Sequence, residues 1–299
     1  MLLPVSPMKG IFYATLSGIL LGTAGIYGVY MLNVGLTIPE FLFLRFFFVL
    51  LMTRGITWKL KQPLRLKKEG MQLALIAALL YGTSATLYYV AAGYLGTGLS
   101  MVLFFCYPVQ VIFLIWALHE EAPSLTTLAS LLVMIVGLFF LIDPTEWISS
   151  SYGAALALLA ALLFGTYFYF LERYTSTLSV WESTYWVCLG NSAFYLSCTL
   201  LQEEITLSLN PTTFAVVLLF AFFSTLLPSL LLLKSFETIS STEASVLSLF
   251  DPLVTVFLGW LFLNETFTPL QITGTVLILA SLTFFHRQKI PLAPKTISN

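Results

Sequence analysis

The sequence predicts an all-α integral membrane protein with ten transmembrane helices. These form two inverted five-helix repeats, and the N- and C-termini are cytoplasmic. Three observations support this fold class: the composition, the placement of positive charge, and an internal repeat. The 299-residue chain is 59% hydrophobic and only 9% charged, whereas soluble domains carry about 25% charged residues. We therefore expect a multi-pass protein of the cell's inner (plasma) membrane.

Ten apolar runs of about 20 residues account for most of the chain, and each is long enough to cross the hydrocarbon core of a bilayer as a helix. The runs are 10–31, 38–57, 70–92, 98–118, 124–142, 152–171, 180–201, 212–234, 241–263 and 268–286. The segments between them are short, so no soluble domain is expected.

The positive charges predict the orientation of these spans. Membrane proteins concentrate lysine and arginine on the cytoplasmic side. With ten spans and a cytoplasmic N-terminus, every lysine and arginine except Arg45 falls in a cytoplasmic segment or at the cytoplasmic end of a span. Arg45 lies inside the run 38–57. The acidic residues Asp143, Glu146, Glu203 and Glu204 fall in outer segments.

An internal repeat divides the chain into residues 1–148, with spans one to five, and residues 149–299, with spans six to ten. Under a shift of 144 residues, Pro108 matches Pro252, Trp116 matches Trp260 and Glu121 matches Glu265. A one-residue gap also matches Gly10, Gly22 and Thr23 with Gly153, Gly165 and Thr166. Because five spans are an odd number, the second repeat is inverted. Inverted repeats with interrupted helices at matching positions are typical of secondary transporters.

Two stretches resemble a known family: LSMVLFFCYPVQVIFLIWALHEE (99–121) and ASVLSLFDPLVTVFLGWLFLNE (244–265). Each has a central proline and a terminal glutamate. FLRFFFVLL (43–51) and QITGTVLILASL (271–282) support the match, although Ser130 replaces the counterpart of Gly274. The sequence is similar to the drug/metabolite transporter superfamily, EamA type. This resemblance implies ten helices in two repeats. It does not define a substrate, because the family carries amino acids, cofactor-like metabolites, nucleosides and drugs.

Asp251 is the main candidate for a binding and coupling residue. It lies near the middle of the run 241–263, where a carboxylate costs about 2.5–3.5 kcal/mol to insert. It could accept a proton or bind a cation and so couple substrate to a proton gradient. Alternatively, it could be neutral, or paired with Arg45, and only hold helices together. The first repeat has Tyr107 at the matching position, so the two repeats differ chemically there.

Further candidates are polar or aromatic side chains within the spans. Arg45 could receive an anionic group such as a carboxylate, or could serve packing alone. Ser248 shares the helix face of Asp251, and Tyr81 and Tyr88 share a face on which a ligand could stack. The candidate substrate-binding residues are Asp251, Tyr107, Gln110, Ser248, Tyr81, Tyr88, Asn191 and Arg45. The candidate hinges are Pro108, Pro252 and Gly22, and the candidate gates are Glu121 and Glu265. Each of these residues also has a packing interpretation.

Several function classes receive no support. The three cysteines lie in apolar runs, and the two histidines lack metal-ligand spacing. We therefore expect no metal and no cofactor. Neither a phosphate-binding loop nor a catalytic motif is recognisable, so we expect no enzyme. A net charge of −1 gives no reason to expect nucleic acid.

The predicted function is secondary active transport of a small polar metabolite, such as an amino acid or a related amine, by alternating access. Transport is expected to be proton-coupled or to proceed by exchange. The alternatives are a passive facilitator (uniporter), or uptake of nucleoside or S-adenosyl-type metabolites. A membrane-embedded enzyme would need paired catalytic groups that the sequence does not offer. The expected partners are the small-molecule substrate, the lipid bilayer and protons, and the protein is expected to be a monomer or homodimer.

Overall fold

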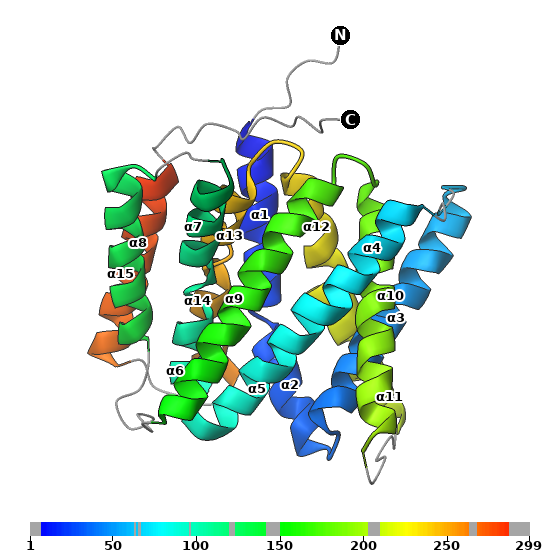
Figure 1. The fold of residues 1–299 in the computed structure, drawn as a ribbon. Coiled ribbons are helices and arrows are strands. Elements are labelled where there is room, and N and C mark those ends of the chain that lie inside the picture. Colours follow the sequence, from blue (N-terminus) through cyan, green and yellow to red (C-terminus); the bar gives the residue numbers. More distant parts are fainter. Residues whose placement is uncertain are drawn as a thin grey trace.

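The protein folds as a bundle of helices (Figure 1). The structure is a computed structural model that describes residues 7–62, 64, 67–95, 97–119, 123–141, 150–202, 210–262 and 268–286. These residues contain helices and their connections and no β-strand. The first turn of α1 (Pro7–Leu21) and the last turn of α15 (Pro269–His286) lie at the same end of the bundle, the upper end in Figure 1.

The helices coincide with the predicted apolar runs, and five runs contain more than one helix. The first half has α1, α2 (Ala24–Asn33), α3 (Ile38–Lys59), α4 (Lys68–Ile76), η1 (Ala77–Gly82), α5 (Thr83–Leu95), α6 (Thr97–Phe104), α7 (Tyr107–His119) and α8 (Leu125–Phe140). The second half has α9 (Ser151–Tyr174), α10 (Val180–Leu200), α11 (Pro211–Ala221), η3 (Phe222–Leu226), α12 (Leu227–Ser235), α13 (Ser241–Leu247), α14 (Phe250–Phe262) and α15. The labels η1 and η3 denote π-helical segments.

The length and apolar character of these helices suit a membrane. Six stretches of the described residues are long and apolar enough to cross one: Ile38–Lys59, Lys68–Leu95, Leu99–Leu118, Ser151–Tyr174, Pro211–Ser235 and Ser241–Leu258. Three shorter apolar helices accompany them: Met8–Leu21, Leu125–Phe140 and Pro269–Leu282. The protein is therefore a multi-pass helical membrane protein. The count of ten spans and the cytoplasmic location of both termini stay predictions.

The positive charges of the described residues gather at one end of the bundle. Apart from Arg45, every lysine and arginine in the described part of the chain lies near the start of α1 or α4 or near the end of α3, α9 or α12. These helix ends all lie toward the upper end in Figure 1. The acidic residues predicted for the opposite side, Asp143, Glu146, Glu203 and Glu204, lie outside the described residues.

Two runs that were predicted as proline-kinked helices are instead divided into two helices each. The chain leaves helical geometry at Phe105–Cys106, between α6 and α7, and at Ser248–Leu249, between α13 and α14. Pro108 and Pro252 follow each break, in the first turn of the second helix, where a missing backbone N–H leaves no intrahelical hydrogen bond unmade. The breaks lie 143 residues apart, within one residue of the spacing of the sequence repeat.

The matched glycines make corresponding close contacts. A Cβ atom on Gly10 would meet Thr238 and Ile239, and one on Gly153 would meet Tyr94 and Leu95. These partners are related by the same 144-residue shift. The π-helical segments η1 and η3 also match under this shift, to within one residue. A contact and a backbone irregularity therefore recur in both halves, and α1 and α9 run in opposite directions (Figure 1).

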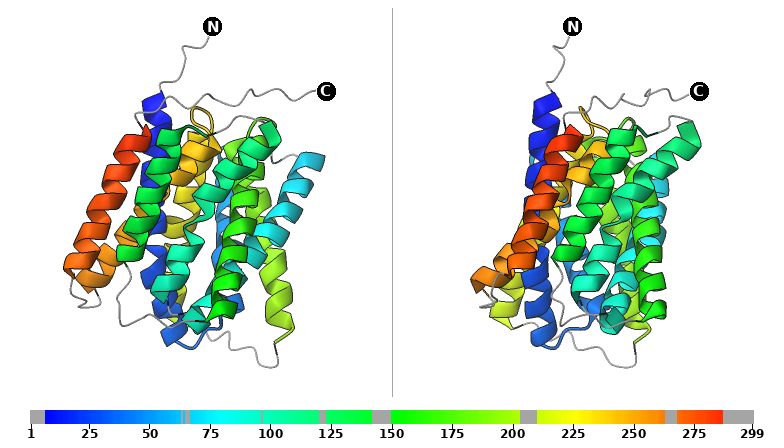
Figure 2. Two further views of the ribbon diagram at one scale, coloured as in Figure 1. Left: turned by 60° about the vertical axis from the view of Figure 1, so that its left-hand side comes forward. Right: turned by 90° about the vertical axis from the view of Figure 1, so that its left-hand side faces the viewer.

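Ser130 and Gly274 are matched positions of the repeat, and the structure explains why one is serine and the other glycine. The helices α8 and α15 pack side by side (Figure 2), and Gly137 and Gly274 bring their backbones together, because a Cβ on Gly274 would lie 2.6 Å from the Gly137 carbonyl. At the repeat-related contact, the Ser281 hydroxyl donates a hydrogen bond to the Ser130 carbonyl at 2.7 Å. One end of this helix pair thus uses two glycines and the other a hydrogen bond.

Candidate substrate site

Asp251 lies in the first turn of α14, directly after the break in the run 241–263. Its backbone N–H donates to the Ser248 carbonyl at 2.9 Å, and its side chain is half-buried. The hydroxyl of Thr255 lies 3.4 Å from the Asp251 Oδ1. The positive end of the α14 dipole favours a negative charge here. A carboxylate at the start of a half-helix, inside an apolar span, can bind a proton or an ammonium group.

Arg45 is held on α3 by groups that the π-helical segment η3 presents. Its Nε donates to the Thr225 hydroxyl at 2.5 Å, and its Nη2 donates to the Ser224 carbonyl at 3.1 Å. The guanidinium also lies over the rings of Phe46 and Phe220, 5.3 and 4.9 Å from their centroids. Arg45 is 7% exposed. Within the described residues its Nη1 group has no hydrogen-bond partner, so the guanidinium can still receive an anion.

The break between α1 and α2 connects the surroundings of these two charged residues. The Gly22 carbonyl accepts a hydrogen bond from the Thr255 hydroxyl at 3.1 Å, and the hydroxyls of Thr23 and Ser224 lie 2.5 Å apart. Although the charges of Arg45 and Asp251 act on each other, these two described side chains form no ion pair. In this conformation the two side chains are therefore not directly paired.

Four tyrosines lie within electrostatic range of the Asp251 carboxylate. The charge of Asp251 acts electrostatically on Tyr81, Tyr88, Tyr89 and Tyr107. Tyr81 belongs to η1, whereas Tyr88 and Tyr89 belong to α5, and these three side chains are partly exposed. The predicted candidates Tyr81 and Tyr88 therefore lie near Asp251, together with Tyr89, which the sequence interpretation left out. π-Helical segments such as η1 are frequent at functional sites.

Aromatic contacts join these tyrosines, in a closed circuit, to Phe46 and Phe220, the two rings that lie against the Arg45 guanidinium. Arg45 itself completes the circuit, because it lies over both Phe46 and Phe220. The ring-centroid distances are Tyr88–Phe104 5.1 Å, Phe104–Phe164 5.2 Å, Phe164–Tyr81 5.4 Å, Tyr81–Phe46 5.6 Å, Phe220–Phe41 6.5 Å, Phe41–Tyr89 5.6 Å and Tyr89–Tyr88 5.3 Å. We name these eight aromatic residues the aromatic circuit. Such rings favour flat groups by stacking and cations over their faces.

Tyr107 and Ser248 are buried and contact each other, and Ser248 lies in the break between α13 and α14 rather than on one helix with Asp251. Tyr107 is 1% exposed, and its hydroxyl forms a hydrogen bond with the Ser248 hydroxyl. Ser248 also donates to the Ser245 carbonyl at 2.6 Å. In this conformation Tyr107, the first residue of α7, therefore connects that helix to the break between α13 and α14.

Gln110 and Asn191 each carry a buried oxygen that has no hydrogen-bond partner among the described residues. The Gln110 Oε1 and the Asn191 Oδ1 are both buried. The Asn191 Nδ2 donates to the Val187 carbonyl of its own helix at 2.9 Å. Gln110 contacts α9 through its Cβ, which would lie 3.6 Å from a Cβ on Gly165. Both amides thus retain an acceptor that a donor could use.

The three candidate hinges lie beside the breaks. A Cβ on Gly22 would lie 2.6 Å from the Asp251 carbonyl, so Gly22 permits the close approach of α1 to α14. Pro108 and Pro252 occupy the first turns of α7 and α14 and are buried. The candidate gates, Glu121 and Glu265, lie outside the described residues.

Besides Tyr89, the sequence interpretation missed four hydroxyl-bearing residues of this site: Thr23, Ser224, Thr225 and Thr255. Serine and threonine are ordinary in membrane helices, where their hydroxyls often bond to their own backbone. A weak signal did exist, because the 144-residue shift aligns Thr225 with Tyr81. The structure adds what that alignment lacks, namely that Thr225 binds Arg45.

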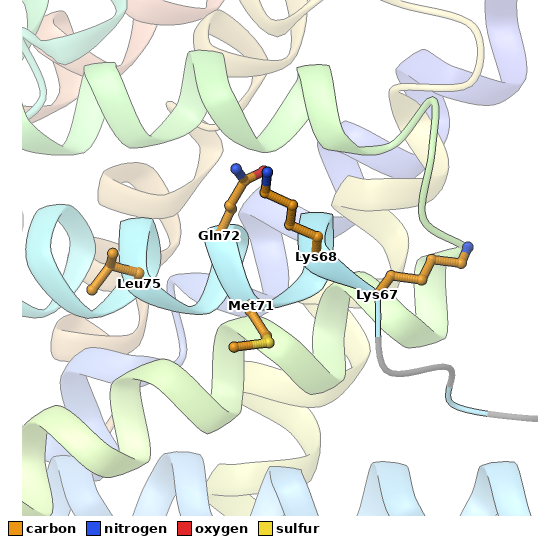
Figure 3. A pocket seen from close by; sticks show the side chains of 5 residues that line it. All are labelled: Lys67, Lys68, Met71, Gln72 and Leu75. Atoms are coloured by element: carbon orange, nitrogen blue, oxygen red, sulfur yellow. The ribbon is translucent and has the colours of Figure 1, made fainter.

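A hollow of about 550 Å³ lies at the start of α4 (Figure 3). It is lined by Lys67, Lys68, Met71, Gln72 and Leu75, all from one helix and its preceding residue. None of the candidate residues lines it. Lys67 is engaged with the start of α10, since its Nζ lies 3.6 Å from the Glu182 carboxylate. This hollow is a feature of the bundle's end and is separate from the Asp251 cluster.

The fold and site define a multi-pass membrane protein with interrupted helices that meet around an acid, a guanidinium and several tyrosines. The model of the EamA-like transporter family matches residues 8–143 and 151–286, so the chain belongs to this family. It is thus a transporter of the drug/metabolite transporter superfamily, which agrees with the resemblance inferred from the sequence.

Individual relatives agree with this assignment. The chain is 23% identical over 253 residues to a Synechocystis protein named as an uncharacterised transporter, covering 82% of this chain and 75% of that protein. It is 24% identical over 273 residues to an uncharacterised transporter of Archaeoglobus fulgidus, covering 91% and 94% of the two chains. One crystal structure matches with a TM-score of 0.77 at 14% identity, covering 93% of this chain and 96% of the other. That last likeness concerns the fold alone.

Proposed function

We propose that this protein is a secondary active transporter that moves an amino acid or a related amine by alternating access, coupled to protons or to exchange. The observation that carries the proposal is the pair of opposite charges in the bundle, Arg45 and Asp251. Each is held by neighbouring hydroxyl or carbonyl groups, and the two do not pair with each other. This arrangement is complementary to a zwitterion, whose carboxylate suits a guanidinium and whose ammonium suits a carboxylate.

Arg45 is prepared to bind without rearrangement. Its Nε and Nη2 are fixed by Thr225 and Ser224, and its ring contacts hold the guanidinium plane. A ligand carboxylate would meet the Nη1 group, which has no hydrogen-bond partner in the described part of the chain. Binding to a preorganised group avoids the cost of ordering it.

Asp251 supplies the coupling in this proposal. A free carboxylate inside an apolar span is costly, so the site favours a state in which a proton or an ammonium group neutralises it. Proton and substrate can then replace each other at one carboxylate. Such competition gives either proton-coupled transport or exchange, and it distinguishes both from a passive facilitator.

The repeats give the proposal its route for alternation. We propose that residues 1–148 and 149–299 are the two inverted repeats, that they form ten spans in the inner membrane, and that both termini are cytoplasmic. Support comes from the matched breaks and from the recurring glycine contacts. Rocking of inverted repeats about a central site is the general mechanism of such folds.

The test is substrate counterflow in proteoliposomes, followed by uptake driven by an imposed pH gradient. Each amino acid is compared with its decarboxylated amine and its deaminated acid. We expect the zwitterion to be exchanged most effectively. Arg45→Gln should remove the advantage of the zwitterion over the amine, and Asp251→Asn should abolish gradient-driven accumulation while the protein stays folded. Equal uptake by the Asp251→Asn variant and the parent protein would overturn the coupling role.

The aromatic circuit favours a second candidate substrate class. Nucleosides and S-adenosyl compounds have flat rings that can stack on tyrosine or phenylalanine, and S-adenosyl compounds carry an amino acid moiety as well. A thermal-shift screen of the purified protein against amino acids, nucleosides and S-adenosyl compounds separates these classes. Stabilisation by nucleosides without stabilisation by any zwitterion would favour the second candidate over the first.

A further inference from the structure

The hydroxyl of Thr255 is placed among three acceptors but has one proton to donate. It lies 3.1 Å from the Gly22 carbonyl, 3.0 Å from the Asp251 carbonyl and 3.4 Å from the Asp251 Oδ1. A bond to the carbonyl four residues earlier is common for threonine in helices. The other two acceptors are unusual, because one belongs to a separate helix and the other is the proposed coupling carboxylate.

The contact that Thr255 makes with Gly22 is the place where α1 meets α14. A Cβ on Gly22 would lie 2.6 Å from both the Asp251 carbonyl and the Val254 Cβ. The two backbones are therefore in close contact, and a change in the hydrogen bond acts directly on their separation. The next residue, Thr23, is hydrogen-bonded to Ser224, whose carbonyl accepts from Arg45.

We propose that Thr255 is a positioning residue that transmits the state of the Asp251 carboxylate to the break between α1 and α2. When the carboxylate is free and charged, its Oδ1 is the strongest of the three acceptors, so the Thr255 hydroxyl donates its hydrogen bond to Oδ1. When a proton or a ligand ammonium neutralises it, the hydroxyl donates to the Gly22 carbonyl and binds α1 to α14. This inference rests on the proposed function of Asp251.

The other groups around Asp251 do not offer the same switch. The titratable and charged described residues that act on its carboxylate are Arg45 from α3, Tyr81 from η1, Tyr88 and Tyr89 from α5, and Tyr107 from α7. Arginine stays charged, and tyrosine is ordinarily neutral at physiological pH. The carboxylate is thus the group whose charge changes, and Thr255 is the neighbour that contacts both it and α1.

The proposal also gives the break at Gly22–Thr23 a role. Gly22 accepts a hydrogen bond from Thr255, which also contacts Asp251, and Thr23 is hydrogen-bonded to Ser224, which also contacts Arg45. Binding of one zwitterion at both charges would therefore act on the same two residues. An amine or an acid alone would act on one of them only.

The variant Thr255→Val tests this inference, because it keeps the shape and removes the donor. Two transport rates are compared in proteoliposomes: counterflow at equal pH on both sides, and uptake driven by a pH gradient. We expect the ratio of gradient-driven uptake to counterflow to fall about tenfold, within the range of measured couplings between sites. Thr255→Ser restores the donor and should restore the ratio.

The control is Thr273→Val on α15. Thr273 is exposed, and its hydroxyl donates to the Pro269 carbonyl of its own helix at 2.8 Å. Thr273→Val therefore removes the same hydroxyl at a position where the hydroxyl bonds only to its own helix. The ratio of gradient-driven uptake to counterflow for this variant should equal that of the parent protein. A Thr255→Val protein in which both rates fall in proportion would overturn the proposal, because Thr255 would then be structural. Counterflow by the parent protein tests the proposed function separately, since its absence would refute transport itself.

Discussion

The substitution Gly22→Ala tests whether the close contact between α1 and α14 stabilises the fold. A Cβ on Gly22 would lie 2.6 Å from the Asp251 carbonyl oxygen and from the Val254 Cβ. Ordinary contact begins at 3.4 Å, so both distances fall about 0.8 Å short. Neither neighbour can rotate away, since one is backbone and the other is the branch point of a side chain. The helices must therefore separate.

The expected magnitude follows from this geometry. Overpacking in a well-packed interior costs about 1–3 kcal/mol of stability. Inside a helix, alanine is more stable than glycine by about 0.5–1 kcal/mol, which offsets part of that cost. Gly22 lies in the break between α1 and α2 rather than inside a helix. The offset is therefore small, and we expect a net loss of stability of about 1–3 kcal/mol.

The repeat provides a matched control. Gly165 is the counterpart of Gly22, and a Cβ there would lie no closer than 3.3 Å, from the Tyr107 carbonyl. It lies inside α9, where alanine is favoured, so Gly165→Ala should change stability little. Gly55→Ala, in α3, meets nothing within 4 Å and should be neutral or stabilising. These two variants separate the contact from the effect of adding a methyl group.

The assay is the midpoint of thermal unfolding of the purified protein in detergent, with counterflow measured on the same samples. A loss of 1 kcal/mol lowers the midpoint by about 2–4 °C in soluble proteins somewhat smaller than this chain. We expect a fall of several degrees for Gly22→Ala and no comparable fall for the two controls. Equal midpoints for Gly22→Ala and Gly165→Ala would refute the inference that α1 and α14 are in close contact at Gly22.

Three further predictions concern hydrogen bonds and charge. Tyr107→Phe removes the hydrogen bond to Ser248 but keeps the ring, and Ser281→Ala removes the hydrogen bond to the Ser130 carbonyl on α8. Each variant should lose about 0.6 kcal/mol of stability, which is the average for interhelical hydrogen bonds in one membrane protein. The loss is measured from the midpoint of thermal unfolding. A loss above about 2 kcal/mol for either would contradict this estimate. Lys67→Met removes a partly exposed ion pair with Glu182 and should lower the stability by less than about 1 kcal/mol. In high salt, the unfolding midpoints of this variant and of the parent protein should lie closer together.

The positions of the helices could be predicted from the sequence because a bilayer demands long apolar runs. The predicted run 38–57 corresponds to α3 (Ile38–Lys59), and the run 180–201 corresponds to α10 (Val180–Leu200). The backbone irregularities could not be predicted in the same way. The break after Leu21 and the segment Phe222–Leu226 are apolar or small in sequence, and their geometry depends on partners in distant helices, such as Thr23 with Ser224.

The candidate site was predictable where a residue is unusual for its surroundings. Asp251 and Arg45 are conspicuous because charged residues are rare inside membrane spans, and both belong to the cluster that the structure contains. Thr225 and Thr255 were not predictable, because a threonine hydroxyl in a helix usually bonds to its own backbone. Only the fold reveals that these two hydroxyls also contact Arg45 and Gly22 on other helices.

The difference between the two matched halves would make the proposed site asymmetric. At matching positions, Tyr107 is buried and hydrogen-bonded across to Ser248, whereas Asp251 is half-buried beside the tyrosines. The matching glycine contacts differ as well: Gly22 is tight against α14, and Gly165 is looser against α7. Inverted repeats can exchange such tight and loose contacts when they alternate. Because the acid is present in one repeat alone, that exchange would change the surroundings of Asp251 while the scaffold around it keeps its form.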